Sequence, residues 1–118
     1  MKYTVTLKKN YEFKNLLQKG KWLSGKYVVL YVLPQKDEEH NKIGFIVSRK
    51  AGNSVFRNRT RRILRQAYSD IEESIKKGYK ILIMWKKKNT EKNLKSTDIY
   101  EDLSNILKES DMLIWKRY

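Results

Sequence analysis

Three segments of the chain carry the alternating or continuous apolar pattern that is typical of β-strands. They span residues 26–33, 43–48 and 79–85, and Pro34 ends the first. Residues 21–25 are predicted to form a turn or a short strand before it. The third segment is apolar almost throughout, as expected of a central strand that is covered on both faces. The pattern therefore predicts a small sheet of about four strands.

Side chains of the first strand alternate between two faces. One face is purely aliphatic, whereas the other carries two tyrosines. The two sets are Val28, Leu30 and Val32 on the first face, and Tyr27, Val29, Tyr31 and Leu33 on the second. We expect the aliphatic face to lie in the core and the tyrosine face to stay partly open.

Two helices are predicted near the ends of the chain. The first has Asn10 as its expected N-cap and is stopped by Gly20. The second is expected to be capped by Thr97, with Asp98 in its first turn. Phe13, Leu16 and Leu17 fall on one side of the first helix, and the expected core residues of the second are Ile99, Leu103, Ile106 and Leu107.

The longest helical pattern begins after Gly52, with Asn53 or Ser54 as its N-cap, and should end near Lys77, ahead of Gly78. At about 100° per residue, its apolar residues fall on one arc and most of its arginines on the opposing arc. The apolar set is Phe56, Thr60, Ile63, Leu64, Ala67 and Ile71, and the opposing set is Arg57, Asn58, Arg61, Arg62 and Arg65. The helix is predicted to pack with one face and to present a basic face to a partner.

Positive charge dominates the chain, with a net charge of +14 on 118 residues. Lysine is spread throughout, but six of the seven arginines lie within residues 49–65. Arg57, Arg61 and Arg65 repeat like charge at a four-residue spacing, which destabilises a helix unless a partner neutralises it. We therefore expect a polyanionic partner, with nucleic acid favoured over a membrane surface.

The sequence offers little for catalysis by the protein itself. It has no cysteine, and its single histidine, His40, lies in the polar loop of residues 35–42. No spacing suggests a metal-ligand set or a glycine-rich phosphate loop. No apolar run approaches the ~20 residues of a membrane span, and the N-terminus lacks a signal-peptide pattern. We expect residues 1–118 to form one cytoplasmic RNA-binding domain that is not catalytic by itself.

Aromatic residues outside the long helix favour RNA over DNA. Rings at Phe13, Trp22, Tyr27 and Tyr31 could stack on unpaired bases, as in readers of single-stranded RNA. Core packing explains any one of them alone. A sequence-specific DNA-binding helix and a structural RNA-packaging protein therefore stay open on these residues.

Residues 52–65 resemble a known family signature. They read Gly-Asn-Ser-Val-Phe-Arg-Asn-Arg-Thr-Arg-Arg-Ile-Leu-Arg, which is similar to the arginine-rich motif of the bacterial ribonuclease P protein subunit. Residues 7–13, the strand through Tyr31 and residues 43–50 follow in the family's order. The resemblance covers residues 5–86, and the motif is long and mixed in chemistry.

In that family the catalyst is an RNA subunit, with Mg²⁺ held mainly by the RNA. The resemblance implies a ribonucleoprotein subunit that acts in tRNA processing, binds the catalytic RNA and precursor tRNA, and helps to remove the 5′ leader without a protein partner. The implied face toward the catalytic RNA is Arg49, Lys50, Asn53, Arg57, Asn58, Arg59, Arg61, Arg62 and Arg65. The implied leader cleft, between the first helix and the sheet, is lined by Phe13, Leu17 and Tyr31.

The implied fold is a single-domain α+β sandwich with element order α-β-β-β-α-β-α and a left-handed βαβ crossover, where a right-handed crossover would be the default. The chain departs from the family pattern at three positions. Leu17 stands where relatives often have an aromatic residue. Ser54 and Thr60 replace an alanine and an aliphatic residue, and both are small enough for the packing face to survive at ~1 kcal/mol.

Overall fold

The computed structural model describes residues 4–36, 39–87 and 93–112, which contain one mixed β-sheet. Its strands are β1 (Thr4–Thr6), β2 (Lys21–Ser24), β3 (Val28–Pro34), β4 (Asn41–Ile46) and β5 (Tyr79–Trp85). They lie in the order β1-β4-β5-β3-β2. β1, β4 and β5 are parallel, whereas β3 is antiparallel to β5 and β2 antiparallel to β3. The apolar segment of β5 is thus the central strand, as predicted.

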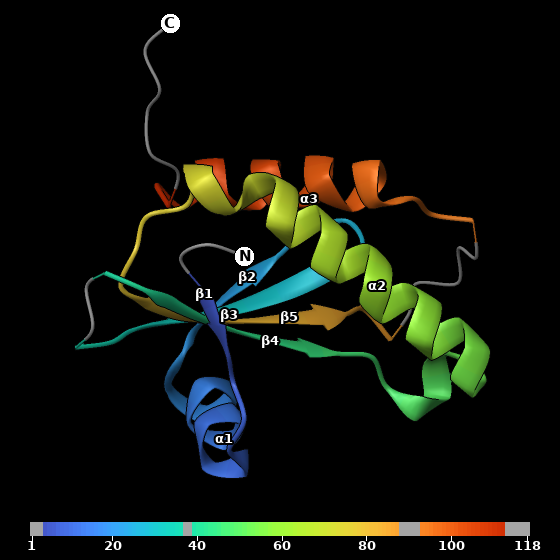
Figure 1. Cartoon of the computed structure of the whole chain (residues 1–118), viewed down its shortest axis with the longest axis horizontal. Helices are drawn as coiled ribbons and strands as arrows, with labels where there is room; N and C mark the ends of the chain where they lie inside the picture. Colours follow the sequence, from blue (N-terminus) through green and yellow to red (C-terminus); the bar gives the residue numbers. More distant parts are fainter. Residues whose placement is uncertain (1–3, 37–38, 88–92, 113–118) are drawn as a thin grey trace, which may run out of the picture.

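Helices cover both faces of this sheet (Figure 1). They are α1 (Asn10–Lys19), α2 (Ser54–Ile71) and α3 (Ser96–Glu109), with 3-10 turns η1 (Arg49–Ala51) and η2 (Glu72–Ser74). α2 and α3 pack together over one face, and α1 lies on the other. The larger apolar core therefore lies beneath α2 and α3, and a smaller one lies beneath α1.

The alternation along β3 has the predicted consequence. Val28, Leu30 and Val32 are at most 5% exposed and belong to the larger core. Tyr31 and Leu33 are half-buried and pack on the smaller core, on the α1 face. The aliphatic core face is confirmed, and Tyr31 and Leu33 are partly open as predicted. Tyr27, which precedes β3, instead packs against the larger core.

The sheet has one strand more than predicted, because residues 4–6 pair with β4. Thr6 lies opposite Ile43, and the Leu7 N–H donates to the Ile43 carbonyl at 2.8 Å. β1 is only three residues long, so its alternation of apolar and polar residues is too weak to predict a strand. Its extended conformation depends on pairing with β4. Residues 21–24 are also a strand, which settles the predicted choice between a turn and a strand.

Two helix starts differ slightly from the predictions. α1 begins at Asn10 itself, with Lys9 as the N-cap residue. α3 has Lys95 rather than Thr97 at its N-cap, and the Asp98 carboxylate accepts the Lys95 N–H at 2.8 Å. The predicted core residues of α3 are all buried, so its register was predicted correctly.

α2 begins where predicted and ends earlier. Asn53 is its N-cap, because the Asn53 Oδ1 accepts the Phe56 N–H at 2.9 Å. The helix ends at Ile71 rather than near Lys77, and η2 follows. Ile75 then adopts an extended backbone and is only 2% exposed, so its burial in the core diverts the chain from the helix.

α2 connects β4 to β5, which are parallel neighbours, and is therefore a crossover helix. Its left-handed form stays a prediction. Met112 is buried at the end of the described residues. None of the helices in the described ranges has the length and apolar character needed to cross a bilayer.

Asp102 ties α3 to the start of β3. Its carboxylate accepts three consecutive backbone N–H groups, those of Lys26 at 2.7 Å, Tyr27 at 2.8 Å and Val28 at 3.2 Å. Asp102 is only 7% exposed. One buried carboxylate thus satisfies three donors and fixes the position of α3 over the sheet.

Glu12 anchors α1 to the opposite face. Its carboxylate lies 3.1 Å from Lys42 Nζ of β4 and 3.9 Å from Lys80 Nζ of β5. Burial alone would raise the pKa of Glu12, but the hydrogen bond from Lys42 and the charges of both lysines outweigh it, so the pKa is lowered. The charged form of Glu12 therefore favours the folded state.

Replacing Glu12 by glutamine (Glu12→Gln) is expected to lower Tm at neutral pH. Since the folded-state pKa is lowered, the stabilisation is present above the unfolded-state pKa and is lost as pH falls through the folded-state pKa. The difference in Tm between Glu12→Gln and the unaltered protein should thus shrink on acidification. Thermal unfolding across the acidic range measures it, with the exposed Glu101→Gln as control. A difference that does not depend on pH would contradict the assignment.

Candidate nucleic-acid interface

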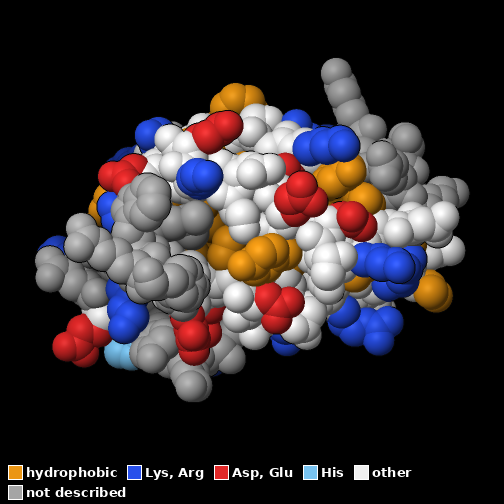
Figure 2. All heavy atoms as spheres, turned by 90° about the horizontal axis from the view of Figure 1, so that it is seen from above, with side chains coloured by type: hydrophobic (Ala, Val, Ile, Leu, Met, Phe, Trp, Pro, Cys, Tyr) orange, Lys and Arg blue, Asp and Glu red, His pale blue; other side chains and the backbone are white. Residues whose placement is uncertain are grey.

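The basic side chains of α2 are concentrated in its N-terminal half. Arg59, Arg61, Arg62 and Arg65 are all exposed. In the view onto the layer of α2 and α3, basic side chains lie at the right, where α2 begins, and also toward the left, with acidic side chains between them (Figure 2). The predicted basic face therefore exists, and it ends at Arg65, two thirds of the way along the helix.

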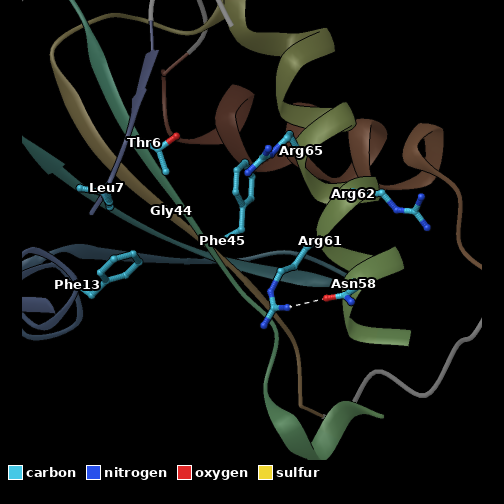
Figure 3. Close-up of a pocket in the computed structure, with 9 residues that line it drawn as sticks. All are labelled: Thr6, Leu7, Phe13, Gly44, Phe45, Asn58, Arg61, Arg62 and Arg65. Atoms are coloured by element: carbon cyan, nitrogen blue, oxygen red, sulfur yellow. Dashed lines mark hydrogen bonds between the residues drawn. The ribbon is translucent and has the colours of Figure 1, made fainter. Parts of the chain in front are cut away.

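A groove of about 420 Å³ lies where α2, β4 and α1 approach one another (Figure 3). Its lining combines arginine and amide groups with aromatic and aliphatic side chains. The lining residues are Thr6, Leu7, Phe13, Gly44, Phe45, Asn58, Arg61, Arg62 and Arg65. Phe13 approaches from α1 and the arginines approach from α2, with β4 between them. Segments that are distant in sequence thus form one site.

Gly44 allows the α1 side of the groove to form. A Cβ atom at this position would lie 2.6 Å from Cε1 of Phe13 and 3.2 Å from Cδ1 of Leu7. The first distance is far shorter than ordinary van der Waals contact. Because glycine has no side chain, the Phe13 ring can lie directly against the backbone of β4.

Tyr68 builds the α2 side of the groove. Its hydroxyl lies 2.8 Å from Thr4 Oγ1, and its ring meets the Phe45 ring edge-on at 6.2 Å. Burial raises the pKa of Tyr68 to about 12, although the hydrogen bond with Thr4 acts in the opposite direction. The neutral phenol therefore holds β1, β4 and α2 together at physiological pH.

The groove is strongly electropositive. None of its nine lining residues is acidic, and three are arginines. The Asn58 Oδ1 accepts a hydrogen bond from Arg61 Nη1 at 3.2 Å, which orients that guanidinium. Guanidinium groups bind phosphate oxygens through paired hydrogen bonds. The arrangement suits an anion that also carries an apolar ring.

Arg57 does not share this exposed face, contrary to the prediction. It is half-buried, and within the described part of the chain its Nε has no hydrogen-bond partner. On the helical wheel Arg57 lies between Leu64 and Tyr68, about 20° from each. Leu64 and Tyr68 are at most 1% exposed. The buried arc of α2 is therefore wider than predicted and includes the stem of Arg57.

The other residues predicted to face the catalytic RNA are distributed around the groove. Asn53 uses its side-chain oxygen as the N-cap of α2. Arg49 and Lys50 are exposed on η1 and do not line the groove. Arg59 lies on the opposite flank of α2. A separate pocket on that flank is lined by Arg59, Arg62, Ile63, Gln66 and Ser96.

The three predicted leader-cleft residues do not line a single cavity. Phe13 lines the groove, whereas Leu17 is 44% exposed on α1 and Tyr31 is half-buried on β3. Tyr31 lies opposite Trp22 of β2, which is 60% exposed. We call Leu17, Trp22 and Tyr31 the α1-side surface. It lies on the same face of the sheet as Phe13 and extends the aromatic character of the groove.

Sequence reasoning missed four groove residues. Thr6 is in β1, Leu7 directly follows β1, and Gly44 and Phe45 are in β4. Phe45 lies in a predicted strand, but its role depends on β1, which the pattern did not reveal. The available signal was Gly44, since a glycine inside a strand often marks close approach of another group.

The α+β fold and the arginine-lined groove define a small, strongly basic protein with an electropositive site. The family model described as ribonuclease P matches residues 1–111. A ribonuclease P protein component from Clostridioides difficile is 35% identical over 112 residues, which covers 94% of this chain and 96% of the relative. One from Oceanobacillus iheyensis is 34% identical over 113 residues, covering 96% and 92%. The chain belongs to the ribonuclease P protein family.

Solved structures agree with this assignment. The RNase P protein from Thermotoga maritima superimposes with a TM-score of 0.79 at 26% identity, covering 89% of this chain and 96% of that chain. The RNase P protein from Staphylococcus aureus gives 0.78 at 26% identity, covering 92% and 97%. The predicted α+β fold class is confirmed. Family membership assigns the protein to tRNA processing, as the protein part of a ribonucleoprotein endoribonuclease.

Proposed function

We propose that the protein binds the catalytic RNA of ribonuclease P through the exposed arginines of α2. It holds the 5′ leader of precursor tRNA beside α1 and so promotes endonucleolytic removal of the leader in the cytoplasm. One observation carries this proposal, namely that Arg61 and Arg65 of α2 line the same groove as Phe13 of α1. Groups suited to phosphate and to unpaired bases are therefore adjacent.

The protein promotes the reaction by differential binding. Precursor tRNA carries a leader and mature tRNA does not, so contacts with the leader favour the substrate over the product. The α1-side surface supplies exposed rings and aliphatic groups for those contacts, and the basic half of α2 supplies the contacts with the catalytic RNA. Cleavage itself is left to the RNA.

Magnesium is held by RNA in this proposal. Mg²⁺ prefers carboxylate, phosphate and water oxygens. The groove instead presents three arginines and no carboxylate, which repel a bare cation. The residues of this chain do not fit a protein-bound magnesium site at the groove. Their part is to neutralise the phosphates of the RNA around the metal.

Tyr31→Ala is expected to reduce the preference for precursor over mature tRNA by roughly tenfold, because a stacked base contributes about 1–3 kcal/mol. Binding of both tRNAs to the reconstituted holoenzyme measures the preference. Tyr100→Ala, which removes an exposed ring from α3, is the matched control. An equal loss for both tRNAs would place Tyr31 in the core and outside the leader site.

Salt dependence tests the phosphate-binding premise. If about five phosphates are contacted, the logarithm of the association constant should fall against the logarithm of salt concentration with a slope of roughly −4. Titration of the catalytic RNA with protein at several salt concentrations gives the slope. An association constant that does not change with salt concentration would contradict phosphate binding. Tighter binding to one DNA duplex than to the RNA would favour the DNA-binding alternative.

A further inference from the structure

The edge of β4 is covered by β1 over only half its length. β1 ends at Thr6, opposite Ile43, and the N–H of Leu7 donates to the Ile43 carbonyl at 2.8 Å. The chain then turns away into α1. β4 continues through Gly44 and Phe45, which pair with β5 on the other side. Beyond Ile43 the outer edge of β4 is therefore left without a strand neighbour in the described part of the chain.

The register shows which backbone groups face this open edge. In a parallel ladder, the N–H and C=O groups of alternate residues point toward the same neighbouring strand. The carbonyl of Ile43 points toward β1, where it accepts the Leu7 N–H. Phe45 lies two residues later, so its N–H and C=O point toward the same side of β4. That side is the groove, which both Phe45 and Gly44 line.

The groove therefore presents three kinds of group together. The Phe13 ring and Leu7 supply an apolar wall on the α1 side of β4, and Arg61 and Arg65 supply positive charge on the α2 side (Figure 3). The backbone of Phe45 supplies a hydrogen-bond donor beside an acceptor. A nucleotide has the complementary parts, namely a flat ring, a phosphate and a base edge with donors and acceptors.

We propose that this groove holds one unpaired nucleotide of RNA, with its phosphate on Arg61 and Arg65, its base against Phe13, and its base edge bonded to the main chain of Phe45. The inference rests on the proposed function and adds a base-reading element to it. The volume of about 420 Å³ lies within the usual range for a small ligand. The nucleotide comes either from the leader or from a loop of the catalytic RNA.

The test removes the Phe45 donor. Phe45 is replaced by its α-hydroxy acid, which keeps the ring, turns the Phe45 amide into an ester and makes the Gly44 carbonyl a weaker acceptor. The same exchange at Tyr11 is the matched control, because Tyr11 is exposed and lies in the first turn of α1, where N–H groups lack intrahelical acceptors. Equal Tm values for both esters and the unaltered protein establish that the fold is retained. Affinity is measured for the catalytic RNA alone and for precursor tRNA on the holoenzyme.

The Phe45 ester should bind one of these RNAs about five- to tenfold more weakly, as expected for one lost hydrogen bond, while the Tyr11 ester binds normally. A loss with the catalytic RNA alone assigns the nucleotide to that RNA. A loss only with precursor tRNA assigns the nucleotide to the leader. One abasic position in the leader should then weaken binding to the unaltered protein by the same factor. Normal binding of both RNAs by the Phe45 ester overturns the inference and leaves the proposed function intact. Failure of the unaltered protein to bind either RNA overturns both.

Discussion

Replacing Arg61 and Arg62 together by alanine is expected to weaken binding of the catalytic RNA by roughly a hundredfold, because each arginine contributes a charge-assisted contact of about 1.5 kcal/mol. The salt slope should become shallower by about 2. Both side chains are exposed and lie away from the buried arc of α2, so Tm should change little. Filter binding across a salt series, with thermal unfolding alongside, measures both quantities.

Lys36→Ala combined with Lys108→Ala is the matched control, since it removes the same charge from two exposed positions outside the groove. Arg61→Lys with Arg62→Lys keeps the charge but loses the planar guanidinium, and should lie between the other two variants. Equal losses for the alanine pair and the control pair would mean that only net charge matters. A large drop in Tm would show that the arginine face is structural.

Asp102→Ala is expected to lower the free energy of unfolding by about 3 kcal/mol. The substitution leaves three backbone donors without their acceptor, and a buried unsatisfied donor costs about 1–3 kcal/mol. The N–H of Lys26 lies nearest to solvent and regains water, whereas that of Val28 stays buried, so the total falls below the sum of three full penalties. Urea unfolding followed by far-UV circular dichroism measures the loss.

Glu101→Ala changes the neighbouring exposed carboxylate and serves as the control, with an expected loss within about 0.5 kcal/mol. Because Asp102 does not line the groove and its carboxylate is bonded to the start of β3, the folded fraction of Asp102→Ala should still bind the catalytic RNA. A destabilisation below about 1 kcal/mol would mean that water replaces the carboxylate at all three donors.

Much of the fold was predictable because its signals are local. The alternation along β3, the apolar run of β5 and the helical spacing of α3 each identify buried residues without knowledge of the neighbours. The long helix and its Asn53 cap were equally clear, since capping chemistry and a change of period coincide at that point. Many residues of the larger core were therefore predicted correctly, whereas Tyr68 and Ile75 were not.

The groove was less predictable because it depends on pairing between distant segments. The three residues of β1 become a strand only beside β4, and the end of β1 at Thr6 leaves the edge beyond Ile43 open. The partial burial of Arg57 likewise depends on elements outside α2 that pack against the start of the helix. A pattern along one helix cannot reveal contacts that other strands impose.

The most direct test of the proposed function is cleavage of precursor tRNA by the catalytic RNA at low magnesium, with and without the protein. RNA phosphates repel one another most strongly when magnesium is scarce, so a protein that neutralises them and holds the leader should help most under these conditions. We predict that the protein accelerates leader removal and that the Arg61→Ala, Arg62→Ala pair loses most of this effect. No acceleration by the unaltered protein would contradict the proposed function.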